Sequence, residues 1–191
     1  FPAALIDGLR ARSKGRAPDA LARVQIIVNT RRMARRLETL FKAGPPGFLP
    51  NILVLSELDK LDPGMAPPPA VSALRKRLEL TKLVARLLDT DRRIAPKSSL
   101  YALSDRLAGL VDEMQGEGVS AEAISQLDVS FQSAHWERTQ QFLQIAAAYL
   151  DQTSDQPDTE ARQRQIELKL VEKWAADPPK HPIILAGSTG S

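Results

Sequence analysis

The segment His181-Pro182-Ile183-Ile184-Leu185-Ala186-Gly187-Ser188-Thr189-Gly190 decides how this chain of 191 residues is expected to fold. Its short apolar run is typical of a buried strand, and the glycines and hydroxyl side chains that follow are typical of a turn that approaches phosphate. We therefore expect a phosphate-loop-like turn at Gly187, Ser188, Thr189 and Gly190. Because such a loop ordinarily leads into a helix, we also expect the chain to be a piece of a longer protein.

A second segment, Val24-Gln25-Ile26-Ile27-Val28-Asn29-Thr30-Arg31-Arg32, has the same organisation. The nearly continuous β-branched run from Val24 to Val28 predicts a strand inside a parallel sheet, where both faces are covered. Thr30 stands where a helix N-cap belongs, and an amphipathic helix is expected from Arg31 to Phe41. The apolar run Asn51–Leu55 predicts another buried strand, and the order strand–helix–strand predicts a parallel crossover.

The composition of the chain changes after this second strand. Residues 59–69 are rich in proline and predict a linker. Between residues 70 and 177, leucine and alanine recur at helical spacing, which predicts a series of amphipathic helices. Residues 178–191 return to the pattern of strand and turn. We therefore expect an α/β fold with a parallel sheet, formed by residues 1–58 and 178–191, and an all-helical insertion subdomain over residues 70–177.

The bulk composition excludes several classes of protein. With 43% hydrophobic and 26% charged residues, the chain is able to bury a core, and it has no apolar run long enough for a membrane span. It contains no cysteine, which excludes disulfides and thiolate metal sites and agrees with an expected cytoplasmic location. The net charge of +3 permits contact with nucleic acid without implying it.

The sequence offers little support for catalysis. A Walker A loop needs a lysine among its glycines, and Gly187–Ser191 has none, so a plain glycine turn is favoured and ATP hydrolysis is not expected. Neither His135 nor His181 has a carboxylate three or four residues away on a shared helix face, and His181 stands in a proline-rich turn. Glu57 and Asp59 follow the second strand as an acidic pair, for which helix capping or solvent exposure is favoured over metal binding. No catalytic residue, metal ligand or cofactor is therefore predicted in this segment.

Arginines occupy the first turns of the helix after Thr30: Arg31, Arg32, Arg35 and Arg36. Each exposed cation there opposes the helix dipole by ~0.3–1 kcal/mol. A phosphate backbone compensates for this cost, because guanidinium groups make bidentate contacts with phosphate and the helix N-terminus itself attracts anions. We therefore expect Thr30, Arg31, Arg32 and Arg35 to contact DNA. The alternative is a surface that is solvated or paired with Glu38.

The other basic and aromatic clusters are expected to be structural. The group Arg75-Lys76-Arg77, with Lys82 and Arg86, is interleaved with Glu79, which favours a solvated helix face. The large aromatic residues of the insertion stand at amphipathic spacing and are expected in the core rather than on a platform for stacked bases: Trp136, Phe142, Tyr149 and Trp174.

Three segments taken together resemble the N-terminal part of the AddB family, the AddB subunits of AddAB-type helicase–nucleases that process double-strand DNA breaks for recombinational repair. They are Val24–Arg35, Leu49–Leu58 and Pro182–Ser191, in the same order and at similar spacing. The resemblance implies a P-loop-NTPase-like domain, similar to the first motor domain of a superfamily 1 helicase, with an inserted helical subdomain. It also implies that the turn Asn29–Arg32 touches single-stranded DNA.

The chain departs from active motors of this kind. The strand end Leu185-Ala186-Gly187 resembles the place where active motors carry an acidic magnesium-binding residue, but no Asp or Glu stands there, and no Walker A motif appears within residues 1–191. The resemblance therefore implies a domain without ATPase activity that holds DNA, either single-stranded or a duplex end, and an AddA-type motor subunit. ATP and magnesium are implied only for the full complex, and the nuclease and any iron–sulfur ligands only for other parts of the protein.

Two other functions stay open from the sequence. One is an active P-loop NTPase whose Walker A motif lies upstream of Phe1. The other is a helical protein-interaction module without a role in nucleic-acid binding, in which the arginines are ordinary surface residues.

Overall fold

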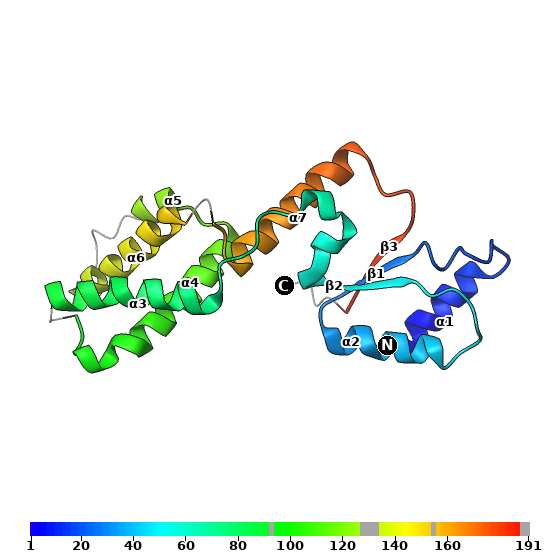
Figure 1. Ribbon diagram of the computed structural model, residues 1–191, viewed down its shortest axis with the longest axis horizontal. Helices are drawn as coiled ribbons and strands as arrows, with labels where there is room; N and C mark the ends of the chain where they lie inside the picture. The colour runs from blue at the N-terminus through cyan, green and yellow to red at the C-terminus, as the bar shows by residue number, and fades with distance from the viewer. Residues whose placement is uncertain (92–93, 127–133, 154–155, 188–191) are drawn as a thin grey trace. The chain divides into compact units, whose positions relative to one another are not determined.

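The computed structural model describes residues 1–91, 94–126, 134–153 and 156–187 (Figure 1). The fold is α/β, with a small parallel sheet and many helices, as the sequence predicted. The chain forms two compact units, which we call the sheet unit (Phe1–Ala66 with Glu167–Ser191) and the helical unit (Pro67–Ile166). The helical unit ends at Ile166, within the last helix of the chain, whereas the expected insertion ended at residue 177.

The sheet unit contains three parallel strands: β1 (Gln25–Val28), β2 (Asn51–Val54) and β3 (Ile183–Ala186). The strand order is β2-β1-β3, so β1 is central. Gln25 aligns with Asn51 on one side and with Ile183 on the other. Since both neighbours start in register with β1, all three strands end at the same edge of the sheet, at Val28, Val54 and Ala186.

Helices α1 (Pro2–Ser13) and α2 (Arg31–Lys42) share one core with the sheet. The buried members of this core include Ile6, Leu9, Ile26, Val28, Leu37, Phe41 and Val54. Removing a large apolar side chain from water stabilises the fold by about 1.5–3 kcal/mol, so this core accounts for the packing of α2 along the sheet. The apolar side of the amphipathic helix α2 therefore packs on the sheet, and this packing fixes the amino end of α2 next to the carboxyl end of β1.

Two short 3₁₀ helices, η1 (Leu55–Leu61) and η2 (Pro63–Met65), follow β2. They are joined to helix α7 (Thr159–Ala176) by polar contacts. Lys169 Nζ donates to the carbonyl of Met65 at 3.3 Å, and Lys173 pairs with Asp62. The hydrogen bond from Lys173 lowers the pKa of Asp62 below its ordinary value. The segment predicted as a linker, 59–69, thus contains ordered structure.

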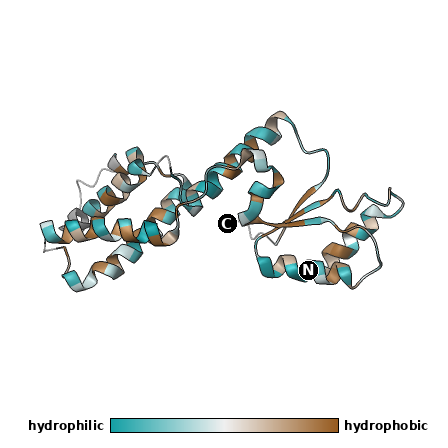
Figure 2. Ribbon diagram, in the orientation of Figure 1, coloured by the Kyte–Doolittle hydropathy of each residue, from teal (hydrophilic) through white to brown (hydrophobic). Residues whose placement is uncertain are grey.

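The helical unit consists of α3 (Ala73–Thr90), the 3₁₀ turn η3 (Lys97–Ser99), α4 (Leu100–Glu117), α5 (Ala121–Ser125), α6 (Ala134–Gln152) and the first part of α7. Figure 2 shows the alternation of apolar and polar residues around these helices. Their buried residues form a second core, which includes Leu80, Val84, Leu88, Leu107, Val111, Met114 and Tyr149. Phe142 packs against this core, as predicted, while Trp174 is half-buried on α7. Trp136 and His135 lie on α6, but their side chains are outside the described part of the chain.

The sequence predicted that Lys76, like its neighbours Arg75 and Arg77, would lie on a solvated helix face. For Lys76 this prediction was wrong. Its side chain is buried, with Nζ 2.5 Å from Asp112 Oδ1 and paired with the equally buried Asp158. Asp158 also accepts a hydrogen bond from the backbone N–H of Ala161 at 3.0 Å, which caps α7. The partners stand far from Lys76 in the sequence, so only the packed helices bring these charges together.

Candidate functional site

The turn between β1 and α2 forms the centre of the candidate site. Thr30 has extended backbone angles, and its Oγ1 accepts a hydrogen bond from the Met33 N–H at 3.2 Å. Thr30 is therefore the N-cap that the sequence predicted, and its hydroxyl satisfies one of the free N–H groups of the first turn. The side chains of Asn29 and Thr30 are exposed at this edge.

The four arginines of α2 all lie on its exposed side, while Ala34, Leu37 and Phe41 face the core. Among the residues that the structure describes, Arg32, Arg35 and Arg36 form no ion pair with a carboxylate. The alternative that the sequence left open, an ion pair between these arginines and Glu38, is also not seen among the described residues. These three guanidinium groups are therefore solvated and available to an anionic ligand.

Arg31 differs from the other three because it has an acidic neighbour. Its Nη2 lies 3.2 Å from Oε1 of Glu57, just after β2, and Lys60 lies 3.0 Å from the other oxygen of the same carboxylate. Three quarters of the Arg31 side chain stays exposed, at 74%, whereas Glu57 is exposed by only 22%. Such an exposed pair contributes at most about 1 kcal/mol, so a phosphate is able to compete for Arg31.

Gly187 places the end of β3 beside this turn. Because Ala186 aligns with Val28, Gly187 follows at the level of Asn29. A Cβ atom at Gly187 would lie 3.8 Å from Oδ1 of Asn29 and 3.9 Å from Cε of Met33. Its φ of +80° is a conformation that glycine adopts without strain. The other members of the expected phosphate-loop-like turn, Ser188, Thr189 and Gly190, lie outside the described residues.

The site therefore combines residues from three strand ends on one edge of the sheet. From β1 the chain passes through α2 to β2 on one side, while β3 lies on the other side. In open parallel sheets, ligands bind outside the carboxyl ends of the strands at the point where the strand order reverses. Thr30 and Gly187, which 156 intervening positions separate in the sequence, both lie at this point. The sequence predicted both turns and a shared parallel sheet, but it did not predict that β3 lies directly beside β1.

The geometry of this edge suits the binding of an anion. In the described ranges, no three His, Cys, Asp or Glu side chains gather as a metal site. Of the acidic pair predicted after β2, Glu57 pairs with Arg31 and Lys60, so it is neither a helix cap nor fully exposed. Over the same ranges, no helix is long and apolar enough to cross a membrane. What the site offers is a capped helix N-terminus with exposed guanidinium groups.

Comparisons with protein-family models, with curated proteins and with solved structures found no match to this chain.

Proposed function

We propose that the sheet unit binds the phosphate backbone of DNA at the carboxyl edge of its sheet. Arg32 and Arg35 contact phosphates directly, Arg31 exchanges Glu57 for a phosphate, and Thr30 holds the first turn of α2 in place. The observation that supports this most is that Arg32 and Arg35, on the first turns of α2, are exposed and have no carboxylate partner in the described structure. Guanidinium groups and the helix dipole both attract phosphate there.

The proposal extends to the role suggested by the resemblance to AddB-type subunits. In it, the chain is a P-loop-NTPase-like, helicase-like part that has no ATPase activity, holds DNA during double-strand break repair, and binds an AddA-type motor subunit. Two features agree with this role: the α/β sheet with a helical unit between β2 and β3, and the buried Ala186 followed by Gly187 where a motor would need a carboxylate. The motor subunit would supply the use of ATP and magnesium.

Fluorescence anisotropy with labelled single-stranded and duplex DNA, titrated at several salt concentrations, tests this proposal. Each phosphate contact on a single strand contributes about −0.7 to the slope of log K against log salt, so three arginine contacts give a slope of about −2. The double variant Arg32→Ala/Arg35→Ala is expected to reduce the magnitude of this slope by about 1.4.

The matched control removes two exposed cations that the proposal does not use, Lys42 at the far end of α2 and Arg106 on α4 of the helical unit. The double variant Lys42→Ala/Arg106→Ala is expected to keep the slope of the wild type. An unchanged slope in the Arg32/Arg35 variant refutes the proposed site. Absence of DNA binding at low salt refutes the DNA-holding role and favours the protein-interaction module.

A further inference from the structure

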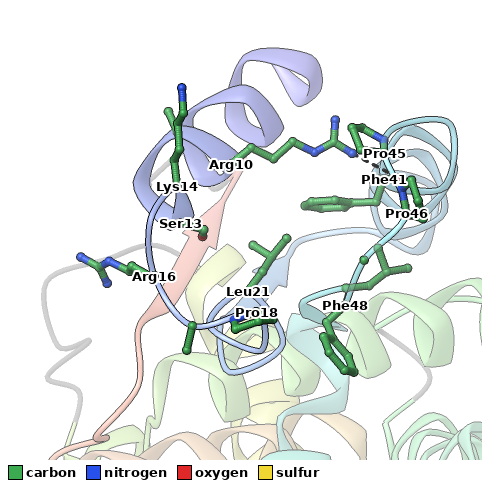
Figure 3. A pocket seen from close by; sticks show the side chains of 14 residues that line it. Arg10, Ser13, Lys14, Arg16, Pro18, Leu21, Phe41, Pro45, Pro46 and Phe48 are labelled. Atoms are coloured by element: carbon green, nitrogen blue, oxygen red, sulfur yellow. Dashed lines mark hydrogen bonds between the residues drawn. The ribbon is translucent and has the colours of Figure 1, made fainter.

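A cavity lies at the opposite, amino edge of the sheet, between the end of α1, the loop into β1 and the loop into β2 (Figure 3). Its volume is about 440 Å³, within the range of roughly 300–1,000 Å³ typical of ligand pockets. The lining includes Leu21, several prolines and the buried ring of Phe41 (Figure 3). The cavity therefore has an apolar floor, and it is separate from the edge to which the proposed function belongs.

The wall between α1 and α2 is held in place by Arg10. Its guanidinium lies 5.8 Å over the Phe41 ring, and Nη2 donates to the Phe41 carbonyl at 3.3 Å. Gly44 passes so close to Arg10 that a Cβ atom there would collide with the guanidinium. These contacts preform the cavity, which reduces the entropy that a ligand has to overcome on binding.

The rim of the cavity is positively charged. Lys14 and Arg16 are exposed and extend outward from it, as Figure 3 shows, and neither forms an ion pair within the described residues. No carboxylate is among the lining residues. A neighbouring cavity shares Ser13 and Arg16 and adds further cations, Arg12, Arg23 and Lys180, again without a lining carboxylate. Arg23 alone of these has an acidic partner in the described structure, Asp19 at 2.6 Å.

Phe48 adds an apolar group at the mouth of the cavity. Its side chain is 61% exposed, and that of the adjacent Leu49 is 39% exposed. Large apolar residues beside a concave apolar floor are typical of surfaces that receive an anchor side chain from a partner. The anchor has to enter among cations, so its flanking residues have to be acidic for the charges to be complementary.

We propose that this cavity docks an acidic segment of a partner protein, with one bulky apolar side chain against Leu21 and Phe48 and flanking carboxylates on Lys14 and Arg16. A single strand of nucleic acid fits less well, because it requires successive open aromatic rings for stacking. Here Arg10 covers Phe41, which leaves Phe48 as the open ring of the cavity.

Selection of random peptides displayed on phage tests this proposal. The wild-type chain is the target, and the double variant Lys14→Glu/Arg16→Glu is used for counter-selection. The selected peptides are expected to combine an aromatic residue or leucine with flanking Asp or Glu. Labelled synthetic copies are expected to bind the double variant about tenfold more weakly. Phe48→Ala is expected to weaken binding as well, and circular dichroism checks that each variant is folded.

The charge-matched control is Lys42→Glu/Arg106→Glu, which reverses two exposed cations outside the cavity and is expected to change affinity by less than about twofold. Recovery of peptides without acidic residues, or of none, overturns the proposal, and so does equal binding by the Lys14/Arg16 variant. Labelled oligothymidylate is measured in parallel. If the Lys14/Arg16 variant binds oligothymidylate more weakly than the wild type does but binds the peptides equally well, the surface binds nucleic acid and the proposal is wrong.

Discussion

Replacement of the buried Lys76 by methionine is the perturbation whose consequence the structure specifies most sharply. Methionine has a similar length and retains the apolar packing of the lysine stem, so the main change is the loss of a charge. That charge compensates Asp158, whose side chain is exposed by only 5%, and Asp112, which is half exposed at 50%. Water is able to solvate Asp112 once the lysine is gone, but it has little access to Asp158.

The magnitudes follow from this difference in exposure. Breaking a buried pair by removing one partner costs about 3–5 kcal/mol, so Lys76→Met is expected to destabilise the helical unit by that amount. Asp158→Asn is expected to cost less, about 1–3 kcal/mol. Lys76 keeps Asp112 at 2.5 Å, and asparagine retains the oxygen that accepts from Ala161 N–H. The double variant Lys76→Met/Asp158→Asn is expected to lose less stability than the sum of the two single variants.

Native-state hydrogen exchange is the suitable assay, because it reports the free energy of opening for each unit. Amides of α3 and α4 are expected to lose protection in Lys76→Met, while those of β1 serve as an internal reference. The matched control is Arg75→Met, one residue away, which breaks an exposed pair with Glu79 at 2.8 Å and is expected to cost about 0.3–0.5 kcal/mol. Equal losses in Lys76→Met and Arg75→Met would refute the reasoning that burial sets the strength of the cluster.

Three further predictions concern other parts of the chain. Burial raises the pKa of Tyr149 from 10.0 to about 12, so the folded state holds this proton more tightly, and stability is expected to fall as the pH rises from 10 towards 12. Urea unfolding at pH 8 and at about pH 11 is expected to show a smaller difference in Tyr149→Phe than in the wild type. Nuclear magnetic resonance is expected to give a pKa for the Asp62 carboxyl below its ordinary value of 3.8, because Lys173 donates a hydrogen bond to it. In Lys173→Gln this pKa is expected to return towards 3.8, and a wild-type pKa of 3.8 contradicts the pairing. Gly187→Ala is expected to cost about 1–2 kcal/mol because of its left-handed backbone, whereas Gly47→Ala, with a Cβ in open space, is expected to change little; equal effects would exclude strain at Gly187.

Local chemistry was sufficient to predict much of the fold. The β-branched run before Asn29 predicted β1, and Thr30 was correctly predicted as the N-cap of α2. The apolar runs around Leu53 and Leu185 correctly predicted strands β2 and β3, but β3 is an edge strand on which Leu185 is exposed, not buried. Each of these signals depends on residues within one or two turns or on neighbouring strand positions. The same local patterns predicted the amphipathic helices between β2 and β3 and thus the α/β class.

Contacts between distant segments were decided only in the tertiary structure. Gly187 lies beside Asn29 because β3 pairs with β1, and Glu57 faces Arg31 because β2 ends in register with β1. Lys76 is buried because two helices bring carboxylates to it, although its neighbours Arg75 and Arg77 stay exposed. Periodicity along a chain shows which face of an element is apolar, but the identity of the groups that pack against that face depends on register and on long-range packing. For this reason the sequence was sufficient to predict each turn of the candidate site. The contact between these turns at one edge of the sheet, in contrast, depends on the pairing of strands that are far apart in the chain.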